Sequence, residues 1–491
     1  MIILCFIIVP LLTAFLIILI AGKKDGWGVV LSLVSAAVLF VLSIIGIIQT
    51  GSQTLTYRMG GWKIPYGISL VQDALSSFML VIISLIALTS LVYSITYVRH
   101  ISRDWKYYAL FMLLLTGMNG VVATGDIFNL YVFMEISLLA AFALVAYGCE
   151  AEEFEAAFKY AVMGSLSSIL ILIGIAVTYS VTSTLTLAKI AQELPLQNPK
   201  LVYWIGGLFL AGFGLKAAAM PFHAWLPDAH SSAPAPISSM LSGVLIKVLG
   251  IYVIIRIYFN VLGAPAAFLD AFLILGALSI VLSGFLAINQ WDMKRLLAYS
   301  SISQIGYILL GIGIATPLGI VGAVFHLLNH AIFKSLLFYD AGAVEMALGT
   351  RDMKKMGNLT RVMPVTSSTS MIASLSLSGI PPFNGFFSKL IIIIAAVQAG
   401  HPVYAFWAVL GSILTLAALM KMQRYGFRGE KIIEAIKAKT TWNMKTAMIT
   451  LAVLCLLVSL LVVPGIREVT LDPVANVILD KTGYIQMVMG R

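Results

Sequence analysis

The residues that could carry chemistry in this sequence are titratable side chains placed inside long apolar stretches. They share the ability to bind or release a proton, and they are Glu135, Lys216, Lys247, His326, His330, Lys334 and Lys389. A charge inside a membrane is costly, so such residues usually face the protein interior and take part in ion or proton movement. The set therefore predicts a chain of proton-carrying groups within apolar helices.

Glu135 and Lys216 are the pair that we expect to begin this chain. Glu135 lies about eight residues into its apolar segment, roughly 12 Å deep. Lys216 has small neighbours and comes just before Pro221, where a helix is expected to break. A nearby carboxylate favours a charged lysine and burial opposes it, so moving the carboxylate away would release the proton. The alternative is a purely structural ion pair.

Further along the chain, three expected carriers are spaced for one helix face. His326, His330 and Lys334 recur every four residues, which places them on a single stripe. Histidine titrates near neutral pH and relays protons readily. The alternatives are histidines satisfied within the core, or a metal site that lacks a nearby carboxylate or cysteine ligand. Lys247 lies in the middle of its segment, where reaching water at either interface is awkward.

Lys389 follows an interruption in its apolar segment, the run Gly379-Ile380-Pro381-Pro382. Backbone groups freed at such a break are tolerated where protein or water satisfies them. A lysine beside the break therefore predicts a hydrated cavity.

A few other charged groups lie near the ends of apolar segments. Asp340 and Glu345 could form a proton exit or could be interfacial charges. Arg256 is expected to extend its side chain to the outer interface. Asp228 and His230 could supply protons from the cytoplasm.

The composition limits the class of protein. Hydrophobic residues make up 60% of the 491 residues and charged residues 11%, against about 45–50% and about 25% in ordinary soluble chains. A soluble enzyme and a nucleic-acid-binding protein are excluded, and the lipid bilayer is the expected surrounding. The three cysteines are far apart and no phosphate-binding or dinucleotide motif is present, so we expect no cofactor and no metal.

The elements that must position the titratable residues are membrane-spanning helices of about 20 residues each. The sequence predicts an all-α integral membrane protein with about 14 of them. The expected segments are 2–21, 27–48, 73–97, 107–124, 127–147, 157–180, 203–220, 237–260, 268–288, 294–313, 317–340, 365–400, 402–420 and 445–463.

The loops between these segments carry an uneven charge. When they are assigned alternately to the two sides, Lys and Arg are concentrated on one side, which the positive-inside rule places in the cytoplasm. We therefore expect a multi-pass protein of the cell membrane with both termini outside. The net charge of +10 then reflects topology rather than a polyanionic partner. The basic loop 421–444 predicts a surface helix at the membrane edge.

A weak internal repeat relates two parts of the chain. The interruption at residues 220–225 resembles that at 381–386, and the same offset aligns several helix starts. Two units of five helices, 4–8 and 9–13, would result, and an odd number of crossings makes the second inverted. Inverted repeats with broken helices, here helices 7 and 12, are typical of transporters. The expected division is 1–100 (helices 1–3), 107–260 (first repeat), 268–420 (second repeat) and 421–491 (surface helix, helix 14 and tail).

Several motifs resemble those of a known family. They are Phe128–Tyr131 with Glu135, residues 221–230 (PFHAWLPDAH), 233–236 (APAP), 325–334 (FHLLNHAIFK) and 379–389 (GIPPFNGFFSK). They resemble the antiporter-like subunits of respiratory complex I and of its relatives, the Mrp-type cation/proton antiporters, whose D-type subunit is closest in size, and the membrane-bound hydrogenase and sulfane reductase complexes. The resemblance implies that Glu135 and Lys216 form the coupling pair and that Lys389 is the terminal residue. Asp340 departs from the family's pattern, which usually has a small or apolar residue there.

Together these observations predict a proton- or Na⁺/H⁺-translocating subunit of a multisubunit membrane complex, with other membrane subunits as partners. Whether that complex is an enzyme stays open. So do two alternatives, a quinone-linked oxidoreductase subunit without its own translocation and a stand-alone secondary transporter.

Overall fold

The computed structural model describes residues 2–20, 26–51, 53–101, 105–429 and 439–490. Helices make up almost all of it. A small antiparallel hairpin joins β1 (Leu55–Arg58) to β2 (Ser69–Gln72), with Leu55 opposite Gln72. The expected all-α membrane fold is confirmed in these residues.

Twelve helical stretches of the described residues are long and apolar enough to cross a membrane. They are α1 (Ile2–Ile20), α2 (Trp27–Thr50), α3 (Ala74–Ile101), α4 (Lys106–Ala123), α5 (Ile127–Val145), α6 (Ala151–Thr182), the run from α10 (Ala235–Met240) through α11 (Val253–Ile255) to Val261, α12 (Ala266–Asn289), α13 (Met293–Ile314), α14 (Pro317–Leu348), α18 (Pro402–Met422) with its extension to Phe427, and α19 (Trp442–Leu457) with its extension to Val462.

The other α-helices are shorter or less apolar. They are α7 (Leu187–Glu193), α8 (Pro199–Ala217), α9 (Trp225–Ser232), α15 (Leu359–Val362), α16 (Pro364–Ser378), α17 (Asn384–Gln398), α20 (Ile466–Thr470), α21 (Asp472–Leu479) and α22 (Lys481–Met489).

The difference from the expected number of about 14 crossings lies in two places. The expected segment 203–220 falls on α8, and the expected segment 365–400 falls on α16 and α17. None of these is among the twelve long apolar spans. The basic loop also differs from expectation. Its described start, to Phe427, continues α18 and is no separate surface helix, whereas residues 430–438 lie outside the described part of the chain.

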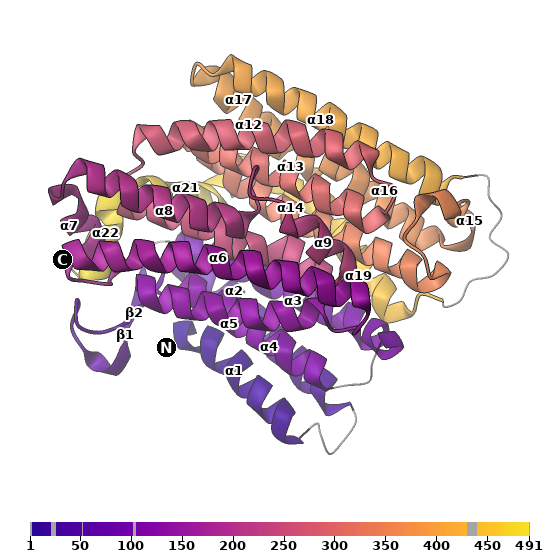
Figure 1. The fold of residues 1–491 in the computed structure, drawn as a ribbon, viewed down its shortest axis with the longest axis horizontal. Helices are drawn as coiled ribbons and strands as arrows, with labels where there is room; N and C mark the ends of the chain where they lie inside the picture. Colours follow the sequence, from indigo (N-terminus) through magenta and orange to yellow (C-terminus); the bar gives the residue numbers. More distant parts are fainter. Residues whose placement is uncertain (1, 21–25, 52, 102–104, 430–438, 491) are drawn as a thin grey trace.

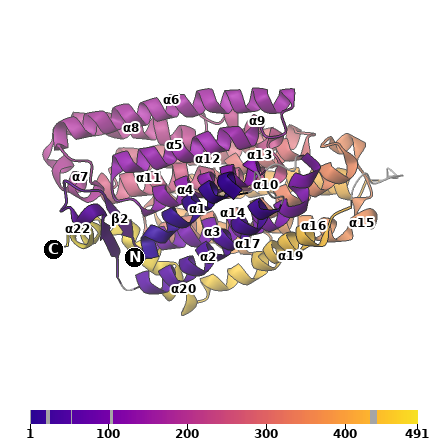
Figure 2. The ribbon, with the colours of Figure 1, turned by 90° about the horizontal axis from the view of Figure 1, so that it is seen from below.

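The helices lie side by side with their axes along the long dimension of the molecule (Figure 1). Two of the spans are fully buried inside the protein: α14 and the run from α10 to Val261. By contrast, α1 and α2 bury only 33% of their most apolar stretch. α14 lies in the middle of both views (Figures 1 and 2). The helix that carries His326, His330 and Lys334 is therefore surrounded by protein and not by lipid.

The two ends of the bundle carry different elements. The β-hairpin, α7 and α22 lie at one end, together with the start of α1, and α15 lies at the other (Figures 1 and 2). The described ends of the chain are thus on the same side of the bundle.

The buried run from α10 to Val261 is not a regular α-helix. It contains three stretches of π-helix, η3 (Leu241–Leu245), η4 (Lys247–Tyr252) and η5 (Arg256–Val261). A π-turn inserts an extra residue into a helical turn, and such turns are frequent at functional sites. Lys247 is the first residue of the second stretch, so the direction of its side chain depends on this irregular geometry.

Two helices end beside the residues of interest. α8 ends at Ala217, and Ala218 has a left-handed conformation with φ of 53°. α16 ends at Ser378, and Gly379 has φ of 82°, a conformation that glycine adopts without a steric penalty. Both ends lie next to prolines, which supply no backbone N–H to continue a helix.

Candidate functional site

Lys216 and Glu135 are brought together through a third residue. The ammonium group of Lys216 on α8 donates to the carbonyl of Gly164 at 2.9 Å and to the hydroxyl of Ser168 at 3.0 Å, both on α6. Ser168 in turn donates to the Oε1 carboxylate oxygen of Glu135 on α5. Lys216 is buried and Glu135 is partly buried. Ser168 therefore bridges the expected pair, and a proton passing between Lys216 and Glu135 would pass through the Ser168 hydroxyl.

A small cavity adjoins Lys216 on the side of the irregular helix. Its lining includes Gly164, Lys216, Trp225 and Leu245, and the free space for the centre of a water molecule is about 10 Å³. That is about the space that one buried water needs. A single water here would lie between Lys216 and the helix that carries Lys247.

Lys247 is completely buried. Its ammonium group donates to the backbone carbonyl of Ser242 in the preceding π-helical stretch. The Ser242 hydroxyl lies 2.7 Å from the hydroxyl of Ser301 on α13. Lys247 is thus held by a neutral backbone oxygen, and the side chain of the same serine joins the irregular helix to α13.

The two histidines of α14 lie in the protein core. Their ring centroids are 6.4 Å apart, and Nδ1 of His326 is 2.9 Å from the hydroxyl of Ser388 on α17. Nε2 of His326 and both ring nitrogens of His330 have no hydrogen-bond partner among the described residues. Buried polar atoms are normally satisfied, so ordered water is the partner that this geometry calls for.

Lys334 lies two turns beyond His326 on the same helix and is also fully buried. Its ammonium group donates to the carbonyl of Leu297 at 2.8 Å and to the hydroxyl of Ser300, both on α13. As with Lys247, neutral oxygens hold the cation.

Lys389 on α17 lies beside the end of α16. Its ammonium group donates to the carbonyl of Leu377 at 2.8 Å and lies 4.6 Å from the centre of the Tyr307 ring. A free carbonyl at a helix C-terminus carries partial negative charge and attracts a cation, and an aromatic face adds to this attraction. The break after Ser378 thus provides the acceptor for the lysine.

A second contact fixes α14 to α17. The side chains of Asn329 and Asn384 hydrogen-bond at 2.9 Å, and Asn329 also donates to the carbonyl of Asn384 at 3.0 Å. Ser376 on α16 donates to the side-chain oxygen of Asn384. The histidine stripe is therefore held in register with both helices at the break.

Ring contacts connect the α14 stripe with Lys389. The ring centroids of His326 and His330 are 6.4 Å apart, and the Tyr307 ring lies 5.5 Å from that of His326. The ammonium group of Lys389 lies 4.6 Å from the centre of the same Tyr307 ring. Glu135 and Lys216 form a separate pair, which the small cavity separates from the rest.

Asp228 and His230 have different surroundings. Asp228 pairs with Lys159 at 2.9 Å and with Arg295 at 2.8 Å, at a surface pocket. His230 is fully buried, with its ring 6.2 Å from that of Trp225. His230 therefore lies in the interior beside α14, with its ring 6.1 Å from that of Phe338, and not at the surface pocket.

The two acidic residues near the end of α14 also differ. Glu345 pairs with Lys294 at 2.5 Å and lies 3.7 Å from Arg351. Asp340 is 1% exposed and accepts a hydrogen bond of 2.7 Å from Thr369 on α16. The interpretation of Asp340 as an interfacial charge is wrong, because it lies inside the protein.

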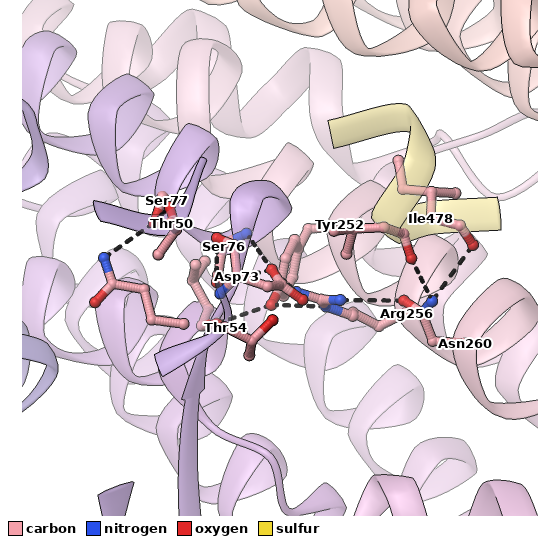
Figure 3. Close-up of polar contacts among 12 residues, drawn as sticks. Thr50, Thr54, Asp73, Ser76, Ser77, Tyr252, Arg256, Asn260 and Ile478 are labelled. Carbon is pink, nitrogen blue, oxygen red and sulfur yellow. Dashed lines mark hydrogen bonds and ion pairs between the residues drawn. The ribbon is translucent and has the colours of Figure 1, made fainter. Parts of the chain in front are cut away.

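Arg256 does not extend to the interface, so that expectation is also wrong. It forms an ion pair of 2.5 Å with Asp73, and both side chains are almost wholly buried (Figure 3). It also donates to Tyr252 and Asn260, each at 3.1 Å. These acceptors satisfy the guanidinium group of Arg256 inside the protein, so the side chain does not need to reach water.

The ion pair with Arg256 changes the pKa of its partner, Asp73. Burial raises the pKa of Asp73, but the charge and hydrogen bond of Arg256 outweigh it and hold the pKa below its ordinary value. The Asp73 carboxylate also caps α3 by accepting from the backbone N–H of Ser76 at 2.9 Å (Figure 3).

Two partner residues could not be identified from the sequence. They are Ser168, which bridges Lys216 and Glu135, and Asp73, which pairs with Arg256. Serines are common in membrane helices and serve packing, so nothing marks Ser168 until α5, α6 and α8 are placed together. Asp73 lies at the start of its segment, where a charge is ordinary. Among the described residues, no group of three or more His, Cys, Asp or Glu side chains is arranged to hold a metal.

The fold and the interior define a class of protein, a multi-pass all-α membrane protein with a row of protonatable side chains in its core. Residues 124–415, more than half of the chain, match the NADH:quinone oxidoreductase/Mrp antiporter transmembrane family, and the chain belongs to that family. The resemblance expected from the motifs is confirmed.

Particular relatives cover nearly the whole chain. The D-type subunit of the Na⁺/H⁺ antiporter of Alkalihalophilus pseudofirmus is 34% identical over 98% of this chain and 99% of its own. The Mrp complex from Dietzia sp. contains a chain with a TM-score of 0.91 and 27% identity, covering 99% of this chain and 98% of that one. The membrane-bound sulfane sulfur reductase, an archaeal respiratory membrane complex, contains one with a TM-score of 0.91 and 30% identity over 99% of both chains.

Proposed function

We propose that this chain is a proton- or Na⁺/H⁺-translocating antiporter-like subunit of a multisubunit membrane complex. The relatives named above belong to an Na⁺/H⁺ antiporter, an Mrp complex and a respiratory membrane complex, and we assign a similar assembly to this chain. Protons would move from Glu135, Lys216 and Lys247 to the α14 stripe and then to Lys389. The stripe consists of His326, His330 and Lys334.

The observation that carries the proposal is how the lysines are held. Four buried lysines have neutral oxygens as hydrogen-bond acceptors, namely Lys216, Lys247, Lys334 and Lys389. A lysine paired with a carboxylate would leave an uncompensated buried charge on losing its proton. A lysine held by carbonyls and hydroxyls leaves no such charge, so it can give and take a proton at lower cost.

The route has two parts. Glu135 and Lys216 would control the first part, with Ser168 as the link between them. The space beside Lys216 would pass the proton toward Lys247 through one water. From there the α14 stripe would lead to Lys389, the terminal carrier of the second part.

We further propose that the two parts are inverted repeats. Asp126 and Thr186 form an isolated β-bridge, and so do Asp292 and Asp352; each pair is 60 residues apart. Each of the two earlier aspartates caps the helix that follows it, α5 or α13. The next long helices, α6 and α14, both have 32 residues. These matching features support the repeat, with the ends of α8 and α16 as the two helix breaks and about 14 crossings in total.

The orientation in the membrane is part of the same proposal. Basic residues are frequent in and just before α15, the helix that lies at one end of the bundle (Figure 1). They include Arg351, Lys354 and Arg361. The positive-inside rule places that end in the cytoplasm. The β-hairpin and the described ends of the chain would then face outside.

The variant Lys216→Ala in the assembled complex tests the proposal. We expect loss of the pH gradient in membrane vesicles with assembly intact. Lys200→Ala, which removes an exposed lysine from the start of the same helix, is the matched control and should behave as wild type. A normal pH gradient in Lys216→Ala would refute the proposal. Translocation by the purified chain alone in liposomes would favour a stand-alone transporter over a complex subunit.

A further inference from the structure

Gln304 on α13 is a buried amide that the route described above does not use. Its side chain is completely buried, and neither Oε1 nor Nε2 has a hydrogen-bond partner among the described residues. Buried polar atoms are normally satisfied, and water is the ordinary partner of such groups inside a protein. The surroundings of this amide therefore show what a water held there would connect.

α13 and α14 lie against each other and run in opposite directions. The Ser300 hydroxyl accepts from Lys334, and the Tyr307 ring lies 5.5 Å from the ring of His326. Residue numbers thus rise along α13 while they fall along α14. The two contacts fix the register between the helices.

Gln304 lies on the face of α13 that meets α14. It is four residues after Ser300 and three before Tyr307, a spacing that puts all three on one side of a helix. His330 has the matching place on α14, since it is four residues from each of the other two members of the stripe. The register therefore places Gln304 at the level of His330, whose two ring nitrogens also lack a partner among the described residues.

The irregular helix brings Lys247 to the same level. At its start, Ala235 packs directly against Gly342 of α14. Further along, a Cβ atom at Gly243 would lie 3.4 Å from the carbonyl oxygen of Ala331. This helix is therefore antiparallel to α14 as well. Lys247, about one turn beyond Gly243, reaches the level of the α14 histidine that precedes Ala331.

A hydroxyl contact fixes the irregular helix against α13. The hydroxyls of Ser242 and Ser301 are 2.7 Å apart, and beyond this contact the two helices run in the same direction. Lys247 follows Ser242 by five residues and Gln304 follows Ser301 by three, about one turn in each case. Gln304 thus lies where three helices meet, level with Lys247 on one neighbour and with His330 on the other.

Both carriers have hydrogen-bonding capacity left at this point. An ammonium group has three donors, and the one hydrogen bond found for Lys247 in the described part of the chain goes to the Ser242 carbonyl. No hydrogen bond joins Lys247 directly to His330 among the described residues. The step from the irregular helix to the α14 stripe therefore needs an intermediate group.

We propose that Gln304 is a positioning residue that holds ordered water between Lys247 and His330. This inference rests on the proposed proton translocation. In the step, an N–H bond of the Lys247 ammonium group breaks and its proton passes to the water, while the water gives one of its own protons to a ring nitrogen of His330. Lys247 is left as a neutral amine and His330 as an imidazolium. The amide neither gains nor loses a proton.

An amide suits this position better than a charged side chain. It can accept a hydrogen bond and donate others at the same time, so it can orient a water that receives a proton on one side and gives one on the other. A carboxylate at the same place would favour the charged form of Lys247 and would oppose release of its proton. The neutral side chain of Gln304 leaves the lysine free to change its protonation state.

Gln304→Met in the assembled complex tests the inference, because methionine keeps the length of the side chain but cannot hold water. We expect the initial rate of pH-gradient formation in vesicles to fall by about tenfold or more, as for the loss of a hydrogen bond to a charged group. The unfolding temperature should stay near that of wild type. A map of the wild-type complex from electron cryo-microscopy that resolves waters should show water beside the Gln304 amide, and the map of Gln304→Met should lack it.

Gln423→Met is the matched control. Gln423 is also buried, but its amide donates to Ser370 at 2.9 Å and to Ser374 at 3.0 Å on α16. Its loss should lower the unfolding temperature and leave the rate of translocation unchanged.

Each outcome supports or overturns the role of Gln304. A wild-type rate in Gln304→Met overturns it, and so does a wild-type map without water between Gln304 and His330. An equal loss of rate in Gln423→Met overturns it as well, because the loss of any buried amide would then explain the effect. If Lys216→Ala abolishes translocation while Gln304→Met is normal, the role of Gln304 fails and the proposed function stands. If Lys216→Ala is normal, both fail.

Discussion

Lys216 reaches Glu135 through the hydroxyl of Ser168, which accepts from the ammonium group at 3.0 Å and donates to the carboxylate. The two charges are thus coupled by a group that can hand a proton on in either direction. A direct contact would bind the charges more tightly and would make their separation more costly.

Ser168→Ala should therefore slow proton translocation while leaving both charged residues in place. A hydrogen bond to a charged group contributes about 1.5–3 kcal/mol, which corresponds to a loss of about tenfold or more. Ser167→Ala is the control, because that neighbouring hydroxyl donates to the carbonyl of Gly212 instead. Initial rates of pH-gradient formation in vesicles measure the effect. Equal rates in the two variants would contradict the bridge.

Lys389→Arg should block translocation although the positive charge remains. Arginine does not lose its proton in proteins, so it can fill the site but cannot act as a carrier, and removal of such a carrier costs about 100-fold or more. Lys421→Arg is the matched control, since Lys421 also donates to backbone carbonyls, those of Ile288 and Gln290. A translocating Lys389→Arg variant would show that Lys389 acts only through its charge.

Gly250→Ala should disturb the contact between α8 and the irregular helix. A Cβ atom at Gly250 would lie 2.6 Å from the Cα and Cβ atoms of Ala217, next to Lys216. Overpacking of this kind costs about 1–3 kcal/mol, so we expect a lower unfolding temperature in detergent and slower translocation. Gly207→Ala is the control, because a Cβ there meets nothing within 4 Å. Equal stability of the two variants would argue against tight packing at this point.

Removing one member of the Asp73–Arg256 pair should destabilise the protein. Breaking a buried ion pair costs about 3–5 kcal/mol, whereas replacing both members by apolar residues is often neutral. We expect Asp73→Leu and Arg256→Met each to lower the unfolding temperature, and the double variant Asp73→Leu/Arg256→Met to recover much of the loss. A double variant as unstable as the sum of the single ones would refute the coupling.

The same pair should make stability depend on pH in the acid range. The pKa of Asp73 is lower in the folded protein than its ordinary value of about 3.9. Its contribution is therefore complete above that value and is lost as the pH falls through the folded pKa. Unfolding temperatures between about pH 6 and about pH 3 should fall more steeply for wild type than for Asp73→Leu/Arg256→Met. Identical slopes would contradict this assignment.

Part of the site could be predicted from the sequence alone. Charged residues are scarce in the apolar segments, so the residue type and the depth in the segment were enough to identify Lys216 and Lys389. The structure also shows which oxygen atoms accept hydrogen bonds from each ammonium group, and the residue type alone cannot show this. Those acceptors include backbone carbonyls such as that of Leu377, which have no signature in a sequence.

Other features could not be predicted because they depend on distant parts of the chain. Asp73 and Arg256 are 183 positions apart, and each looks ordinary in its own segment. The π-helical stretches around Lys247 break the 3.6-residue period on which helix-face arguments rely. The helices α8, α16 and α17 lie where the sequence indicates, but their lengths depend on the breaks beside them.

The contacts of Arg256 also bear on the order in which the protein can be completed during synthesis. Asn260, which accepts from Arg256, donates to the carbonyl of Val477 at 2.9 Å, and the ring of Tyr484 lies 5.4 Å from the guanidinium. These partners in α21 and α22 leave the ribosome long after Arg256 itself. Before α21 and α22 pack in place, Arg256 and Asn260 lack these contacts. A chain that ends before α21 would therefore be recognised by membrane quality control as incompletely folded.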